Sequence, residues 1–151
     1  KAANLLLGSD FRIRIGDFGL SKFMAQSKQT ATICGTPSFI APEVMEEEEY
    51  DPFKADVYSF AIMLWEIFNC SDPYSSFDPC EDLYLAVTKG KRPKFTPKFP
   101  PELLSLVSRG WAKDPKARPS FSVLAKELDE IYAQEELQTR YCQRHISCSY
   151  P

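Results

Sequence analysis

The sequence lacks an excess of either charge, a cysteine framework and a long hydrophobic run. Its 18 basic and 21 acidic residues give a formal net charge of −3 over 151 residues. Nothing therefore draws the whole domain to a phosphate backbone, and we do not expect nucleic acid as a partner. Five scattered cysteines, none in a C-x-x-C pair, exclude a disulfide scaffold and fit a reduced, intracellular chain.

Membrane-spanning and secretory signals are absent as well. The densest apolar run extends only from Val57 to Trp65, whereas a spanning helix needs about 17–25 residues. Residue 1 is Lys, and no signal-peptide pattern follows it. We expect no membrane span in this segment and a cytoplasmic location, with an upstream membrane anchor left open. We also expect the chain to be a piece of a longer protein.

What is present indicates a mostly helical globular domain. Hydrophobic residues make up 44% of the chain and aromatic residues 13%, as in proteins that bury a core. Residues 4–7 and 11–15, joined by a Gly-Ser-Asp turn, predict a β-hairpin with one buried and one wet side. Residues 20–35 are small and polar without a period, which predicts a mobile loop.

The strongest helix signal runs from Ala55 to Asn69, where nearly every face is apolar. Such a helix lies at the centre of a fold. Short helices are predicted from Pro42 and from Asp78–Pro79, and longer ones around residues 103–111 and 121–132. The prolines of residues 91–101 predict an irregular connection.

Three short strings occur in a fixed order. They are Lys1-Ala2-Ala3-Asn4, Asp17-Phe18-Gly19, and residues 35–43, which read G-T-P-S-F-I-A-P-E. With D-V-Y-S-F at residues 56–60 and D-P…R-P at residues 114–119, they resemble the C-terminal part of a protein kinase catalytic domain. The resemblance implies an incomplete kinase C-lobe over residues 1–138, with a small β-hairpin, an activation loop and a helical subdomain. Residues 139–151 would be a frayed tail.

The resemblance also implies a reaction, ATP-dependent transfer of a γ-phosphoryl group to Ser or Thr of a protein substrate, with ATP and Mg²⁺ as cofactors. Asn4 and Asp17 would hold the metal, because an amide oxygen and a carboxylate are hard ligands that suit Mg²⁺. Lys1 would touch the transferred group, and Thr36 would bridge Lys1 and the family's catalytic Asp. Leu6 would lie beneath the adenine ring.

Other matching positions would be structural. Phe18 and Gly19 complete the D-F-G string. Glu43 and Arg118 resemble the buried ion pair that holds the substrate-side loop against the helical subdomain. Asp56 would sit in the first turn of the central helix and accept hydrogen bonds from the catalytic-loop backbone.

The predicted loop carries hydroxyl groups that are candidate phosphorylation sites. Thr30 and Thr32 are favoured, with Ser27 next. A phosphate there would add about −1.5 to −2 charges and could order the loop against basic side chains.

The strings also indicate a kinase class. The Lys three positions before Asn4, and G-T-P before A-P-E, look like serine/threonine kinases, whereas D-V-Y-S-F and R-P-S-F are typical of tyrosine kinases. The mixture is similar to the tyrosine-kinase-like group of serine/threonine kinases. Ala61 stands where that group usually has Gly, and Gly110 where Cys is common.

By the same resemblance, the chain begins two residues after the catalytic Asp of H-R-D-L-x-x-x-N, and the N-lobe that places ATP would be a missing partner in the parent chain. We therefore expect these residues alone to be inactive, and to expose apolar surface and aggregate. Three interpretations stay open. The chain is part of an active kinase, a pseudokinase that binds partners, or a helical interaction module that uses the Pro-rich residues 91–101.

Overall fold

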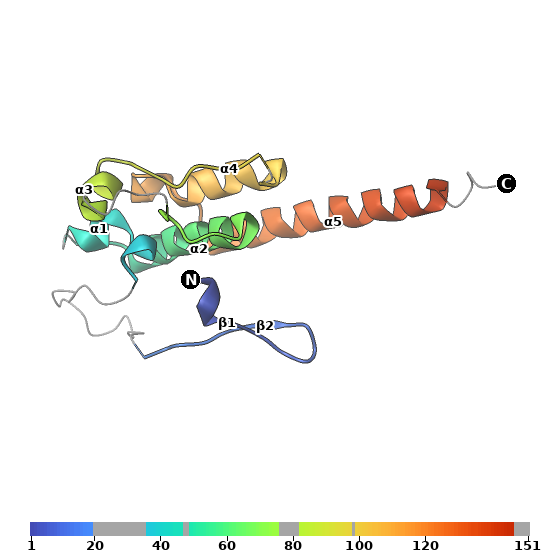
Figure 1. Ribbon diagram of the computed structural model, residues 1–151, viewed down its shortest axis with the longest axis horizontal. Coiled ribbons are helices and arrows are strands. Elements are labelled where there is room, and N and C mark those ends of the chain that lie inside the picture. The colour runs from blue at the N-terminus through green and yellow to red at the C-terminus, as the bar shows by residue number, and fades with distance from the viewer. Residues whose placement is uncertain (20–35, 47–48, 76–81, 98, 147–151) are drawn as a thin grey trace.

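A computed structural model describes residues 1–19, 36–46, 49–75, 82–97 and 99–146, with side chains of the last helix described as far as residue 134. Within these residues the chain is mostly helical with one two-stranded sheet (Figure 1), as predicted. The elements are η1 (Ala2–Asn4), β1 (Leu5–Leu7), β2 (Ile13–Ile15), η3 (Pro37–Phe39), α1 (Pro42–Met45), α2 (Pro52–Asn69), α3 (Leu83–Thr88), α4 (Pro101–Gly110), η4 (Pro115–Ala117) and α5 (Phe121–Ile146), where η marks a 3-10 helix.

The central helix α2 begins three residues before its apolar pattern. Asp51 is its N-cap, and the carboxylate accepts the backbone N–H of Phe53 at 2.9 Å. Pro52 then takes the first helical position, where a missing N–H costs no hydrogen bond. The prediction that Asp56 lies in the first turn is therefore wrong, because the cap moves the start of the helix back to Pro52.

The core forms around α2, as the composition of that helix predicts. Tyr58 and Ile62 of α2 have no exposed surface, and α4 lies alongside (Figure 1). The buried cluster comprises Ala41, Ala55, Val57, Tyr58, Ala61, Ile62, Leu64, Trp65, Val87, Phe99, Leu103, Leu106, Val107, Trp111 and Leu124. Because these residues come from every helix from α2 to α5, the burial of α2 fixes the whole helical body.

Helix α4 approaches α2 closely at Gly110. A Cβ built on Gly110 would lie 2.8 Å from the Cβ of Ala61, closer than real Cβ atoms come to other atoms. The two departures from the tyrosine-kinase-like pattern therefore face each other. The larger residue stands at position 61 and the smaller at position 110. The space between the two helices is therefore occupied by a side chain of α2, the methyl group of Ala61, and not by one of α4.

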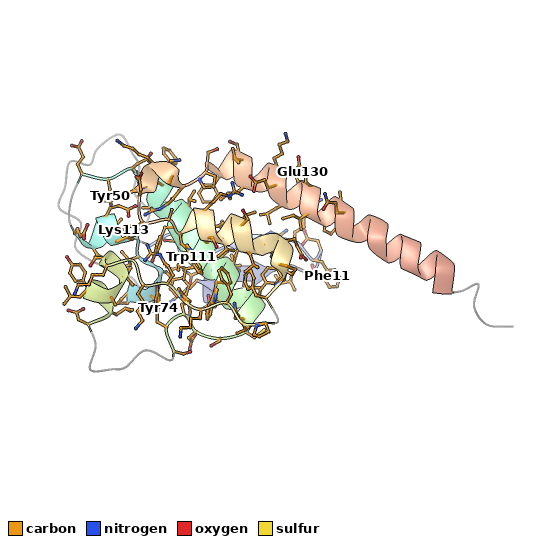
Figure 2. The ribbon with its side chains drawn as sticks, turned by 90° about the horizontal axis from the view of Figure 1, so that it is seen from above. Phe11, Tyr50, Tyr74, Trp111, Lys113 and Glu130 are labelled. Carbon is orange, nitrogen blue, oxygen red and sulfur yellow. The ribbon has the colours of Figure 1, made fainter. Side chains whose placement is uncertain are left out.

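The hairpin forms as predicted, but the prediction that one side is buried is wrong. The strands are antiparallel, with Leu5 opposite Ile15 and Leu7 opposite Ile13. Ile13 and Ile15 are 64% and 68% exposed. Figure 1 shows the reason: the hairpin lies beside the helical body, and no described element packs on its apolar side. At its turn, Phe11, labelled in Figure 2, is 86% exposed.

Two helix ends also differ from the predictions. The helix expected from Asp78–Pro79 begins at Leu83, because Asp82 caps it by accepting the N–H of Tyr84 at 2.9 Å; residues 78 and 79 lie outside the described residues. The backbone of the expected tail is helical as far as Ile146, since residues 133–144 are rich in strong helix formers. None of the helices in the described ranges is long and apolar enough to span a bilayer.

The contact between α2 and α4 gives a first test. We expect Gly110→Cys to lower the free energy of unfolding by about 1–3 kcal/mol, because the new side chain overpacks against Ala61. Adding Ala61→Gly opens space, so the double variant should lose less than the sum of the two single losses. Urea unfolding of the four proteins measures this coupling.

Ser108→Cys, on an exposed position of the same helix, is the matched control and should change stability little. A Gly110→Cys protein as stable as the wild type, or strictly additive losses, would contradict the account of this contact.

Candidate functional site

The register of the hairpin brings two predicted site residues together. The pairing of Leu5 with Ile15 places Asn4 opposite Gly16, whose N–H donates to the carbonyl of Asn4 at 2.8 Å. Asp17 is the next residue along the chain. The side-chain Nδ2 of Asn4 donates to Oδ2 of Asp17 at 3.4 Å. Asn4 and Asp17, 13 positions apart in the chain, are therefore in contact at the open end of the hairpin.

This pair fits a magnesium ion in the chemistry of its donors. A carboxylate and an amide oxygen are hard ligands, and a half-turn of the Asn4 amide would exchange its nitrogen for its oxygen. Mg²⁺ is usually held by one or two carboxylates and keeps water and phosphate oxygens as its other ligands. No group of three or more His, Cys, Asp or Glu side chains suited to a metal occurs in the part of the chain that the structure describes. The pair could therefore hold Mg²⁺ only together with water or phosphate.

Asp17 also has an unusual backbone. Its φ of 61° lies in the left-handed region, which Asp tolerates better than most residues but which still stores strain. The carboxylate is exposed at this turn. Strained residues of this kind cluster at sites where a side chain must be held in one direction.

The second predicted contact joins Lys1 and Thr36. Nζ of Lys1 donates to Oγ1 of Thr36 at 3.3 Å, across 35 residues of chain. Thr36 directly precedes η3, and Lys1 directly precedes η1, which ends at Asn4. The strings at residues 1–4 and 35–43, which we call the metal-side and substrate-side strings after their predicted roles, thus meet through one hydrogen bond. The bridging role of Thr36 toward a catalytic Asp stays a prediction.

The other predicted positions lie nearby without forming contacts that test their roles. Leu6 is 59% exposed and Phe18 is 66% exposed, and Gly19 is exposed beside Asp17. An adenine contact for Leu6 therefore stays a prediction. The candidate phosphorylation sites Ser27, Thr30 and Thr32 lie outside the described residues.

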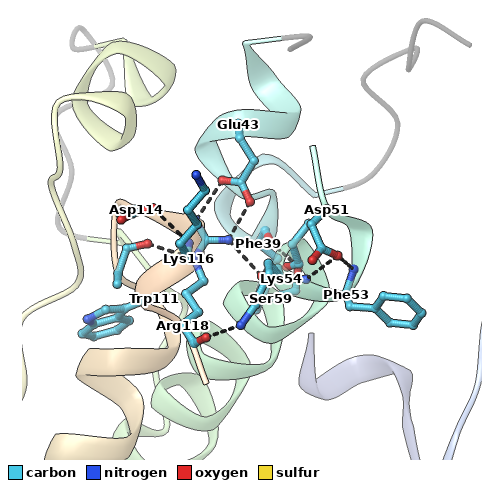
Figure 3. A network of polar contacts seen from close by, with 12 residues as sticks. Phe39, Glu43, Asp51, Phe53, Lys54, Ser59, Trp111, Asp114, Lys116 and Arg118 are labelled. Atoms are coloured by element: carbon cyan, nitrogen blue, oxygen red, sulfur yellow. Dashed lines mark hydrogen bonds and ion pairs between the residues drawn. The ribbon is translucent and has the colours of Figure 1, made fainter. Parts of the chain in front are cut away.

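Glu43 and Arg118 form a bidentate ion pair (Figure 3). Their two N–O distances are 2.6 and 2.8 Å, and the Arg118 side chain has no exposed surface. The guanidinium also donates to the carbonyls of Ala112 and Lys54, both at 2.9 Å. It lies 5.1 Å from the centre of the Tyr58 ring. This one side chain therefore joins α1, α2 and the segment between α4 and α5.

The contact between α2 and the Lys1–Asn4 string differs from the one we expected. The backbone N–H of Ala2 donates to Oε2 of Glu66 at 2.7 Å. Asp56 accepts no hydrogen bond from the described residues, so its role stays a prediction; partial desolvation raises the pKa of its carboxyl group. Glu66 is not among the residues predicted from the sequence. A signal for it exists there, because an acid that follows the long apolar stretch of residues 60–65 needs a partner.

The ion pair of Figure 3 gives a second test. Arg118→Met should lower the free energy of unfolding by about 3–5 kcal/mol, because it strands a largely buried carboxylate. Glu43→Gln should cost less, since Arg118 keeps two carbonyl acceptors and the Tyr58 ring. Chemical unfolding measures both variants. Lys126→Met, in an exposed pair with Glu130, is the control and should cost under about 1 kcal/mol. Equal losses for Arg118→Met and Lys126→Met would contradict the account.

Comparison with known proteins agrees with this geometry. The family model described as protein tyrosine and serine/threonine kinase matches residues 1–128. Serine/threonine-protein kinase STY17 of Arabidopsis thaliana is 34% identical over 145 residues, 96% of this chain and 25% of that protein. Probable serine/threonine-protein kinase drkC of Dictyostelium discoideum is 40% identical over 135 residues, 87% of this chain and 18% of that protein.

Serine/threonine/tyrosine-protein kinase HT1 of Arabidopsis thaliana is 34% identical over 130 residues, 86% of this chain and 33% of that protein. The chain thus spans a third or less of the length of these relatives. The family match covers both strings of the site, the buried ion pair and all of α2. On this evidence, the chain belongs to the protein tyrosine and serine/threonine kinase family.

Proposed function

We propose that the protein containing this chain is a protein serine/threonine kinase that transfers the γ-phosphoryl group of ATP to a Ser or Thr hydroxyl of a protein. One observation carries the proposal: the Asn4–Asp17 pair and the Lys1–Thr36 contact bring the metal-side and substrate-side strings to one place. Phosphoryl transfer needs charge neutralisation and alignment more than covalent chemistry. The carboxylate of Asp17, the amide of Asn4 and the ammonium group of Lys1 are groups that meet that need, and Asn4 and Lys1 belong to the same short string.

Each residue would have a distinct part in this reaction. When bound at Asn4 and Asp17, Mg²⁺ would neutralise charge that develops on the phosphate oxygens. Lys1, exposed and held by Thr36, would place its ammonium group at the transferred phosphoryl group. Thr36 would keep the Lys1 side chain from turning into solvent. Leu6 would supply apolar surface for the adenine ring.

The proposal extends to regulation and location. Phosphorylation of Thr30, Thr32 or Ser27 would add charge to the segment between the two strings, where it could order the chain against basic side chains. A cytoplasmic location fits the few scattered cysteines, which give no disulfide framework. We also propose that these 151 residues do not transfer phosphate by themselves, because the family's proton acceptor would precede Lys1.

A helical interaction module without chemistry is the second candidate. The Pro-rich segment, its expected docking element, packs onto α2 of its own chain. Nε1 of Trp65 donates to the carbonyl of Lys94 at 3.2 Å, and Phe99 is 4% exposed. The segment is thus engaged within the fold, which favours the kinase. A pseudokinase would not need metal ligands, and Asn4 and Asp17 are both present.

The proposed function predicts the effect of removing a metal ligand. In the complete protein, Asp17→Asn should lower kcat for phosphorylation of a Ser/Thr peptide at least about 100-fold, the scale on which losing one preorganised electrostatic contact slows an enzyme. Transfer of ³²P from γ-labelled ATP measures the rate.

Asp10→Asn is the matched control, because Asp10 is an exposed carboxylate on the same hairpin that pairs, among the residues with a described position, with Arg14 and the local backbone. It should keep wild-type activity. A wild-type protein that transfers no phosphate, or an Asp17→Asn protein that keeps its activity, would defeat the proposed function.

A further inference from the structure

Between Ala55 and Phe68, the mostly apolar helix α2 carries a line of three polar residues. Asp56, Ser59 and Glu66 are spaced by three and seven residues. Seven residues are two turns of an α-helix, so Ser59 and Glu66 lie on the same face, about 10.5 Å apart along the axis. A helix that served only as a core would not need this line, because buried polar groups are costly without partners. Ser59 and Glu66 each have a hydrogen-bond partner. One partner lies in the substrate-side string and the other in the metal-side string.

Ser59 holds the substrate-side string. Its Oγ donates to the carbonyl of Phe39 at 2.7 Å, and the carbonyl of Ala55 in its own helix lies farther away, at 3.3 Å. A hydroxyl has one proton, and the shorter distance favours Phe39 as the acceptor. Phe39 ends η3, the short helix that Thr36 precedes. Figure 3 shows this hydrogen bond between α2 and the loop above it.

Glu66 holds the metal-side string. Its Oε2 accepts the backbone N–H of Ala2 at 2.7 Å, and Ala2 lies in η1 between Lys1 and Asn4. Both of these hydrogen bonds, which we call ties, end on backbone groups of the strings. They therefore fix where each string lies without depending on the side chains of that string. Each tied backbone group is within three residues of Lys1 or Thr36, whose side chains meet at 3.3 Å.

We propose that Ser59 and Glu66 are positioning residues that set the distance between the metal-side and substrate-side strings. The inference rests on the proposed kinase function. Ser59 holds the segment that faces the protein substrate, and Glu66 holds the segment that carries Lys1 and Asn4. Both hydrogen bonds start from the same face of one buried helix. The helix therefore fixes the distance between the two strings, across which the phosphoryl group moves. A small shift at either tie misaligns the reactants and slows transfer.

The two ties predict different kinetic effects in the complete protein. Ser59→Ala should lower kcat for peptide phosphorylation by about three- to tenfold, the size expected for one lost hydrogen bond, and leave the slow hydrolysis of ATP by water unchanged. Glu66→Ala should lower both rates, because it frees the metal-side string. Ala is the better helix former, so Ser59→Ala does not unfold α2. Steady-state assays with a Ser/Thr peptide, and with water alone as acceptor, measure the two rates.

Conservative variants separate positioning from stability. Ser59→Thr and Glu66→Gln keep a hydroxyl donor and a carbonyl acceptor, and should recover most of the wild-type rate. Ser108→Ala, on an exposed face of α4, is the control and should leave both rates unchanged. Equal loss of peptide transfer and ATP hydrolysis in Ser59→Ala, or no recovery in Ser59→Thr, would overturn the inference.

Hydrogen exchange gives a readout that does not depend on turnover. The amides of Phe39 and Ile40 donate to the carbonyls of Thr36 and Pro37 within η3, at 3.0 and 3.2 Å. These amides should exchange faster in Ser59→Ala and at the wild-type rate in Ser59→Thr. Unchanged exchange in Ser59→Ala would overturn the tie itself. An inactive wild type with the expected exchange would instead point to failure of the proposed function.

Discussion

The position of every site residue depends on how α2 is buried. Its apolar faces pack against α4, the start of α5 and the Pro-rich segment, so the helix cannot shift without opening the core. Ser59 and Glu66 on this helix hold the two strings to which we assign the chemistry. Burial and function therefore act through the same element. A helix on the surface would restrict the positions of Ala2 and Phe39 less, because fewer packing contacts would restrict the movement of the helix itself.

A second constraint acts at the other end of the substrate-side string. That string runs through η3 into α1, where Glu43 meets the buried Arg118. Arg118 shares the Tyr58 ring with Arg92, whose guanidinium lies 5.0 Å from the ring centre. Burial raises the pKa of Tyr58, so its hydroxyl stays neutral in the core. The string is thus fixed to α2 twice, by Ser59 at η3 and by the Arg118 network at α1.

Much of the fold could be predicted from the sequence, because apolar periodicity and turn residues report local structure. The hairpin, the buried α2 and the helix at α4 follow from these patterns. The start of α2 was placed too late because its cap, Asp51, lies before the apolar period begins. The start of α3 was placed too early because Asp82, and not the Asp-Pro pair before it, caps that helix. The exposed side of the hairpin could not be foreseen, since alternation shows which side is apolar and not what covers it.

The candidate site was predictable in its residues and less so in its contacts. The resemblance of the three strings to the protein kinase family identified Asn4, Asp17, Lys1 and Thr36, and their residue types suit phosphoryl transfer. The partners of Ser59 and Glu66 could not be derived, because both contacts join segments 20 and 64 residues apart in the chain. Such contacts depend on tertiary packing. Even so, the polar line in α2 was visible in the sequence as an exception to its apolar pattern.

The central claim is that Asn4 and Asp17 hold one metal ion beside a nucleotide. Anomalous diffraction from crystals of the complete protein grown with Mn²⁺ and a non-hydrolysable ATP analogue tests this directly. The account predicts an anomalous peak in contact with Oδ1 of Asn4 and the Asp17 carboxylate, at about 2.1–2.2 Å, close to the Mg–O distance. A nucleotide-bound peak that contacts neither side chain would contradict it.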